Sequence, residues 1–139
     1  HLASCPGLLS NYPEPEPFSV EKKLSEIYGI PIDNILVTNG ATEAIYLIAR
    51  KKQESKSAIV VPTFREYQDA CAMFGHIVRF LPVCEELNGI VFDCKPDLVW
   101  ICNPNNPTGM VFNREKLLKL IDSIPETLFV VDQAYAESR

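Results

Sequence analysis

Short runs of consecutive apolar residues alternate along the chain with longer segments in which apolar residues recur at every third or fourth position. The runs are typical of buried strands, and the longer segments are typical of amphipathic helices. The pattern predicts strands at residues 35–38, 58–61, 77–81, 98–102 and 128–131, with a short additional strand at 90–92. It predicts helices at residues 41–51, 64–74 and 113–124, after a first helix that follows Ser19 and stops at Gly29. This alternation indicates an α/β fold in three layers, with helices on both faces of a mostly parallel sheet.

Ahead of the first helix, prolines occupy every second position from 13 to 17. Proline excludes helix and restricts the residue before it, so we expect this segment to be extended. Ser19 has a short hydroxyl side chain, which favours the N-cap of the helix that follows. We therefore divide the chain into an extended N-terminal arm, residues 1–18, and one domain, residues 19–139.

Polar and turn-forming residues follow four of the predicted strands. They lie at residues 39–43, 62–67, 103–109 and 132–135. In an open parallel sheet, ligands bind beyond the carboxyl ends of the strands, so we expect these four clusters to share one edge of the sheet. The sequence therefore predicts a binding site at that edge.

The residues Gly40, Ala41 and Thr42 open a predicted helix. The first backbone N–H groups of a helix have no partner within it, and together with the helix dipole they favour an anion such as a phosphate. The alternative is an ordinary strand–helix turn in which Thr42 only caps the helix, because a single glycine turn is a weak signal.

The segment 103–109 reads N-P-N-N-P-T-G. Pro104 and Pro107 each keep the preceding residue out of the helical region, so the loop is stiff and presents Asn105 and Asn106 in fixed directions. An amide N–H held in this way can donate to a ligand oxygen. The alternative is a structural turn that uses asparagine, proline and glycine for their backbone preferences.

Asp132 ends the last predicted strand, and Tyr67 lies one turn into a predicted helix. A carboxylate that is partly buried at the sheet edge needs a positive partner or several donors, and a protonated ring nitrogen would satisfy it. A helix cap or a metal-binding aspartate is the alternative. Tyr67 could offer a ring face to a ligand, although tyrosines in such positions are more often packing residues.

Five strings occur together in one order: Y-P-E-P at Tyr12, T-N-G-A-T-E-A-I at Thr38, P-T-F-R-E-Y at Pro62, N-P-N-N-P-T-G at Asn103 and D-Q-A-Y at Asp132. In these strings the chain resembles the fold-type I enzymes that depend on pyridoxal 5′-phosphate (PLP). It resembles in particular the branch that holds histidinol-phosphate aminotransferase and L-threonine-O-3-phosphate decarboxylase. The resemblance implies a partial large domain of the PLP-dependent transferase fold, with PLP as the cofactor.

The resemblance implies a role for each matching residue around the cofactor ring. Asp132 would pair with the pyridinium nitrogen, and this contact keeps the ring able to take up electrons. Asn106 and Tyr135 would donate to the phenolic oxygen of the ring, and Tyr67 would stack on its face. Gln133 stands where the family commonly has glutamate, which leaves the contact of Asp132 unaffected.

The resemblance assigns the cofactor phosphate to the backbone of Gly40, Ala41 and Thr42. Tyr12 would reach across a dimer interface to the phosphate bound by the partner subunit. In such enzymes the active site is shared between two subunits, so the implied assembly is a homodimer. Open sheet edges and uncovered apolar faces would also favour association.

Some groups that the family needs do not occur in this chain: the Schiff-base lysine, an arginine that grips the phosphate, and an arginine for the substrate carboxylate. We expect the chain to be part of a larger domain that stops before that lysine. By itself it should be inactive and bind PLP weakly and noncovalently at best. Lys116 and Lys119 belong to a predicted helix, and we assign them to its solvated face.

The resemblance implies a class I/II aminotransferase, similar to histidinol-phosphate aminotransferase, that acts on an amino acid or amino-phosphate. Threonine-phosphate decarboxylation remains an alternative, because the groups that select the reaction lie outside the chain. A non-enzymatic alternative is the PLP-fold domain of a transcription regulator, which a basic helix-turn-helix upstream would favour. A flavodoxin-like or nucleotide-binding domain ranks last, because it explains neither N-P-N-N-P-T-G nor D-Q-A-Y.

Composition narrows the classes of partner. A net charge of −5 over 139 residues does not favour nucleic-acid binding, and no apolar run is long enough to span a bilayer. The five cysteines form no C-x-x-C pair, which argues against a disulfide framework and against a zinc or other metal site. Reduced thiols favour a cytoplasmic protein.

Overall fold

The structure is a computed structural model that describes residue 12, residues 14–82, residue 92 and residues 94–136. The chain divides into two compact units, residues 1–38 and 39–139. The sequence analysis placed the division after residue 18, whereas the first unit extends to Thr38. Hydrogen bonds explain the difference, because Ser25 Oγ donates to the Ile30 carbonyl over 2.6 Å and thereby ties the chain that follows to the first helix.

The first unit holds helix α1, Phe18–Tyr28, and a short 3₁₀ helix, Ile32–Asn34. The prediction that Ser19 caps α1 is wrong, because the helix starts one residue earlier, with Pro17 at the N-cap and no side-chain cap. Proline suits a helix start because its fixed φ is already helical. Ser19 Oγ instead donates to the carboxylate of Glu14. The helix ends, as predicted, at Gly29 in the left-handed conformation.

The strand predicted at residues 35–38 does not form. Ile35 is locally extended, but the backbone N–H of Val37 donates to Glu21 Oε1 over 3.2 Å and not to a neighbouring strand. Leu36 is 71% exposed, which no buried strand would allow. The additional strand predicted at residues 90–92 lies mostly outside the described residues.

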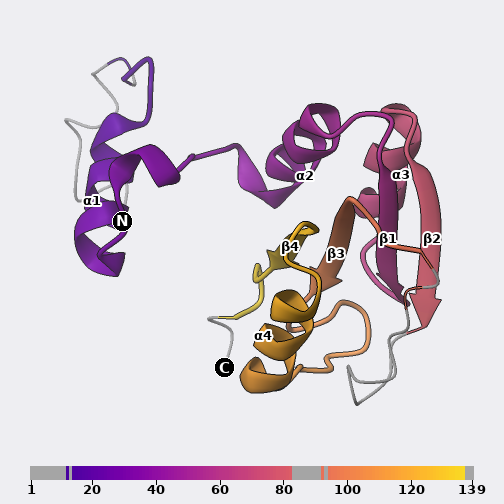
Figure 1. Ribbon diagram of the computed structural model, residues 1–139. Helices are drawn as coiled ribbons and strands as arrows, with labels where there is room; N and C mark the ends of the chain where they lie inside the picture. The colour runs from indigo at the N-terminus through magenta and orange to yellow at the C-terminus, as the bar shows by residue number, and fades with distance from the viewer. Residues whose placement is uncertain (1–11, 13, 83–91, 93, 137–139) are drawn as a thin grey trace. The chain divides into compact units, whose positions relative to one another are not determined.

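The second unit contains a four-stranded sheet whose strands are all parallel and run in the order β2-β1-β3-β4 (Figure 1). Its strands are β1 Lys56–Val61, β2 Ile77–Pro82, β3 Leu98–Cys102 and β4 Leu128–Asp132. Each coincides to within two residues with a strand predicted from the apolar runs. The prediction of a parallel α/β sheet is therefore confirmed.

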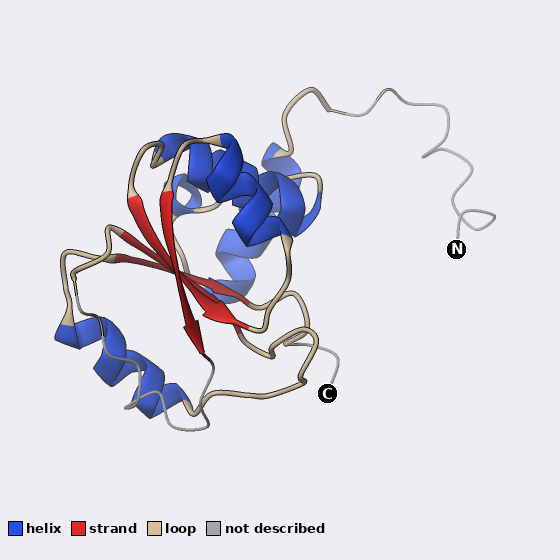
Figure 2. Ribbon diagram, turned by 90° about the vertical axis from the view of Figure 1, so that its right-hand side faces the viewer, coloured by secondary structure: helices blue, strands red, loops and turns tan. Residues whose placement is uncertain are grey.

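Helices cover both faces of this sheet, which gives the predicted three layers (Figure 2). Helices α2, Gly40–Lys51, and α3, Glu66–Met73, lie on one face. Helix α4, Arg114–Ser123, lies on the other. Among the described residues, no helix combines the length and the apolar character that crossing a membrane requires.

The two faces carry two cores because successive residues of a strand point to opposite sides. Strand β3 is buried along its whole length. Trp100 packs with Tyr67 and Cys71 on the side of α2 and α3, and Val99 packs with Leu117 on the side of α4. A continuous apolar run such as β3 is what a strand covered on both faces needs.

A buried polar bridge joins three elements at the end of the sheet where the strands begin. Ser57 Oγ lies 2.6 Å from His76 Nδ1, and His76 Nε2 lies 2.9 Å from the carbonyl oxygen of Ala49. A carbonyl only accepts, so Nε2 carries a hydrogen and donates to Ala49, while Nδ1 shares a hydrogen bond with the Ser57 hydroxyl. The bridge connects the end of α2 to the starts of β1 and β2.

Ser57→Ala should destabilise the protein by about 1–3 kcal/mol, because His76 Nδ1 would be left buried without its hydrogen-bond partner. Urea unfolding of the full-length variant measures this loss. Ser123→Ala is the matched control, since that hydroxyl is exposed and donates only to the Leu120 carbonyl. Equal free energies of unfolding for the two variants would contradict this role of the bridge.

Candidate active site

A pocket opens at the carboxyl ends of the strands, where the sequence analysis expects ligands to bind. Its cavity has a volume of about 140 Å³. Its lining comes from the start of α2, from the last residues of β3 and β4, and from the segments that follow β1, β3 and β4. The lining residues are Ala41, Thr42, Phe64, Cys102, Asn106, Asp132, Ala134 and Tyr135.

The start of α2 is shaped to present backbone N–H groups. Gly40 has φ +79°, a left-handed conformation that side chains disfavour, although a Cβ there would meet no other atom. The carboxylate of Glu43 accepts from the backbone N–H of Asn39. The first-turn N–H groups of Ala41 and Thr42 have no partner within the helix by geometry, and both residues line the pocket. This end of the pocket suits an anion.

The loop after β3 separates structural from pocket-facing asparagines. Asn105 is 5% exposed, and its Nδ2 donates to the Pro62 carbonyl over 2.9 Å and to Thr108 Oγ1 over 2.7 Å. Asn103 Oδ1 accepts from the backbone N–H of Phe112 over 2.9 Å. Asn106 is the asparagine of this loop that lines the pocket. Asn105, which the sequence analysis also expected to face a ligand, holds the loop to the end of β1.

Asn105→Ala should therefore affect mainly stability, and Asn106→Ala should affect mainly ligand binding. Asn105→Ala should reduce the free energy of unfolding by about 1–3 kcal/mol, because the Pro62 carbonyl would lose the donor that Asn105 provides. Asn106→Ala should change stability by less than about 0.5 kcal/mol, because its half-buried side chain makes no hydrogen bond to the described residues, but should weaken ligand binding. Thermal unfolding and ligand titration of both full-length variants measure the two effects. Loss of stability in Asn106→Ala alone would contradict the assignment.

Asp132 is the acid of the pocket and is held by two donors. Its Oδ2 accepts from the Tyr67 hydroxyl over 2.6 Å, and its Oδ1 accepts from the backbone N–H of Ala134 over 2.9 Å. Its main-chain carbonyl accepts from the N–H of Asn103 over 2.8 Å, which fixes the end of β4 beside β3. Each carboxylate oxygen keeps acceptor capacity, so the group can bind a further donor from the pocket.

Tyr67 does not offer a ring face to the pocket, contrary to the sequence analysis. Its side chain is fully buried and stacks on Trp100 with ring centroids 5.3 Å apart. Burial, and then the hydrogen bond to Asp132, raise the pKa of the Tyr67 phenol far above its usual value. The aromatic residue after β1 that lines the pocket is Phe64, whose ring meets Tyr67 edge-on at 5.9 Å.

Sequence reasoning missed Phe64 and Cys102 as lining residues. Phe64 stands three positions before Tyr67, so the spacing alone placed both aromatic residues on the same face of one predicted helix. Cys102 reads as a core residue, and it is only 3% exposed, with Sγ donating to the Pro104 carbonyl over 3.2 Å. Tyr135 lines the pocket and is half exposed.

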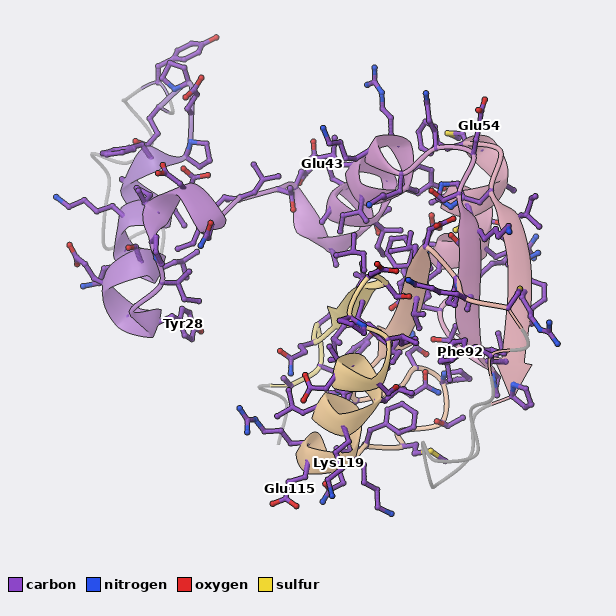
Figure 3. All side chains as sticks on the ribbon, in the orientation of Figure 1. Tyr28, Glu43, Glu54, Phe92, Glu115 and Lys119 are labelled. Atoms are coloured by element: carbon purple, nitrogen blue, oxygen red, sulfur yellow. The ribbon has the colours of Figure 1, made fainter. Side chains whose placement is uncertain are left out.

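Of the residues predicted to hold the cofactor, Gly40 and Tyr67 are not among those that line the pocket. Tyr12 belongs to the first unit, and its side chain is 98% exposed. Lys119 projects from the outer side of α4 together with Glu115 (Figure 3). The sequence analysis assigned Lys116 and Lys119 to the solvated face of this helix; Lys119 is exposed, Lys116 is half-buried, and neither lines the pocket.

Comparison with known proteins agrees with this geometry. The model of the family "Aminotransferase class I and II" matches residues 6–138. Histidinol-phosphate aminotransferase of Buchnera aphidicola subsp. Cinara cedri is 35% identical over 93% of this chain and 39% of its own length. Histidinol-phosphate aminotransferase 1 of Bacillus cereus is 32% identical over 98% of this chain and 39% of its own length. The chain thus spans about 39% of these curated relatives.

Solved structures show the same fold. L-threonine-O-3-phosphate decarboxylase from Porphyromonas gingivalis superposes with a TM-score of 0.90 and 40% identity over 98% of this chain and 44% of that one. Histidinol-phosphate aminotransferase from Sinorhizobium meliloti, in complex with pyridoxal-5′-phosphate, gives a TM-score of 0.80 at 20% identity over 99% of this chain and 40% of that one. The second likeness is evidence of fold alone. With a family model that matches nearly its whole length, this chain belongs to the aminotransferase class I and II family.

Proposed function

We propose that the full-length protein is a PLP-dependent aminotransferase, similar to histidinol-phosphate aminotransferase, that acts on an amino acid or amino-phosphate. The observation that carries this proposal is that one pocket is lined both by the start of helix α2 and by the carboxylate of Asp132. The fit to PLP is chemical, because the cofactor joins a phosphate to a flat ring with a basic nitrogen. The helix start suits the phosphate, and Asp132 suits the nitrogen.

Asp132 would pair with the ring nitrogen and keep a proton on it. A carboxylate that already has two donors and keeps further acceptor capacity is suited to this contact. When bound, PLP would supply an electron sink for the electron pair released at the substrate's α-carbon. Asp132 would support that chemistry by holding positive charge at the nitrogen.

The remaining lining residues would orient the ring. Asn106 and Tyr135 would each donate to its phenolic oxygen, and their side chains border the pocket. Phe64 would lie against the ring face in place of Tyr67, because Phe64 is the aromatic that borders the pocket after β1. The backbone of Gly40, Ala41 and Thr42 would bind the phosphate.

We further propose a homodimer in which an N-terminal arm, residues 1–18, carries Tyr12 to the partner's cofactor phosphate. The first unit supports this proposal because α1 has no buried residue and its apolar side chains Phe18, Ile27 and Tyr28 are about 60% exposed. Apolar surface of this kind is covered in a stable assembly. A cytoplasmic location is proposed on the free thiols of Cys71, Cys94 and Cys102.

Decarboxylation of threonine phosphate is the second candidate. Its support is the 40% identity and the TM-score of 0.90 to the enzyme from Porphyromonas gingivalis. The two reactions differ in which bond at the α-carbon is broken. Amino-group transfer breaks the bond to hydrogen, and decarboxylation breaks the bond to the carboxylate. The residues that bind the substrate carboxylate decide this choice.

The test is a paired assay of the full-length protein loaded with PLP. Histidinol phosphate with a 2-oxo acid as amino acceptor measures amino-group transfer, and threonine O-3-phosphate measures carbon dioxide release. We expect turnover in the first assay. Carbon dioxide release alone would replace the first candidate by the second, and a protein that neither binds PLP nor turns over either compound would contradict both.

A further inference from the structure

We infer that Tyr67 is a positioning residue: its hydroxyl holds the carboxylate of Asp132 in the orientation that the cofactor ring requires. This inference rests on the proposed function of Asp132. It assigns to Tyr67 a role different from ring stacking, because the side chain lies behind the pocket wall and not in its lining.

The geometry ties the carboxylate to two separate parts of the fold. The Tyr67 hydroxyl, on α3, donates to Oδ2 over 2.6 Å, and the Ala134 N–H, just after β4, donates to Oδ1 over 2.9 Å. One donor on each oxygen restricts rotation of the carboxylate plane. Without the hydroxyl, the donor that remains among the described residues is the Ala134 N–H, which belongs to the same segment as Asp132, and the carboxylate could turn.

Tyr67 is itself fixed by its neighbours. Its ring stacks on Trp100 with an interplanar angle of 15° and meets the ring of Phe64 at 84°. Trp100 belongs to a strand that is buried along its whole length. Tyr67 therefore connects Asp132 to a rigid part of the sheet. It also contacts Phe64, which lines the same pocket.

The Tyr67 hydroxyl is also a permanent donor. Burial and the neighbouring carboxylate raise the pKa of this phenol, so it keeps its proton across the working range of a protein. A donor to a carboxylate stabilises the charged form of that carboxylate. With this hydroxyl donating to it, Asp132 would be placed to hold a proton on a ring nitrogen.

Tyr67→Phe isolates this effect because it keeps both ring contacts and removes only the hydroxyl. Tyr46→Phe is the matched control: the Tyr46 hydroxyl donates to Glu66 Oε2 over 2.9 Å, and Tyr46 does not line the pocket. Both variants lose one tyrosine-to-carboxylate hydrogen bond. Only the first should affect the cofactor site.

The experiment titrates the cofactor-free full-length protein with pyridoxine 5′-phosphate, which has the ring and phosphate of PLP but no aldehyde. Tyr67→Phe should weaken binding about tenfold, as expected for losing a hydrogen bond to a charged group. The ultraviolet spectrum of the bound ring should shift toward the form with an unprotonated nitrogen. Tyr46→Phe should match the wild type in both readouts.

A double-mutant cycle with Asp132→Asn separates this inference from the proposed function. If Asp132→Asn weakens analogue binding, and Tyr67→Phe adds little in that background, the two residues act together as inferred. If Asp132→Asn matters but Tyr67→Phe changes only the melting temperature, with wild-type affinity and spectrum, the positioning role is wrong. If Asp132→Asn has no effect on binding or spectrum, the proposed function of Asp132 fails first.

Discussion

Asp132→Asn in the full-length protein should reduce amino-group transfer by roughly 10²–10³-fold, the loss typical of removing one preorganised electrostatic contact from an active site. Asparagine keeps the size of the side chain and can still accept from the Tyr67 hydroxyl, but it carries no negative charge. The ring nitrogen would then lose the partner that keeps it protonated. The rate constant at saturating substrate measures this effect.

Asp122→Asn provides the control for that measurement. Asp122 is an exposed residue of α4, outside the pocket, so its replacement should leave the rate within a factor of two or so, as for surface substitutions in general. Equal rates in Asp132→Asn and the wild type would contradict the role given to Asp132.

Trp100→Ala should destabilise the protein by about 3–5 kcal/mol, the usual cost of truncating a buried aromatic residue. Trp100 is fully buried in the centre of the sheet and supports the ring of Tyr67. The substitution would leave a cavity directly behind the acid of the pocket. Denaturant unfolding of the full-length variant measures the change in free energy.

Trp100→Phe should cost far less than Trp100→Ala. Phenylalanine keeps a buried aromatic ring at this position and gives up mainly volume. If the two variants unfold at the same denaturant concentration, packing of the indole ring is not what stabilises this face of the sheet.

The apolar runs at residues 58–61, 98–102 and 128–131 predicted strands correctly because a strand covered on both faces needs a continuous apolar sequence. The same reasoning was wrong at residues 35–38. A short apolar run does not reveal whether another strand is available to pair with it. Here the Glu21 carboxylate takes the N–H of Val37, and Leu36 stays exposed.

The aromatic pair of the P-T-F-R-E-Y string shows a similar limit. Phe64 and Tyr67 are three positions apart, which would place them on one face of a single helix. Helix α3 begins at Glu66, however, so Phe64 lies in the turn before it and reaches the pocket, while Tyr67 is inside the core. The exact start of the helix decided which ring a ligand could meet, and sequence patterns define helix ends poorly.

The loop at residues 103–109 was predicted as a stiff element that presents amides, and the structure divides its amides between two tasks. The side-chain amide of Asn105 donates hydrogen bonds to Pro62 and Thr108 within the fold. Asn106 borders the pocket. Both residues have the same chemistry, so only the path of the backbone distinguishes them.

A crystal structure of the full-length protein with PLP tests the central claim most directly. The account predicts the ring nitrogen within about 2.7–2.9 Å of the Asp132 carboxylate, the distance of a charge-assisted hydrogen bond. It also predicts the phosphate at the N–H groups of Ala41 and Thr42 and Phe64 against the ring. A cofactor bound elsewhere, or in this pocket with its nitrogen turned away from Asp132, would contradict the account.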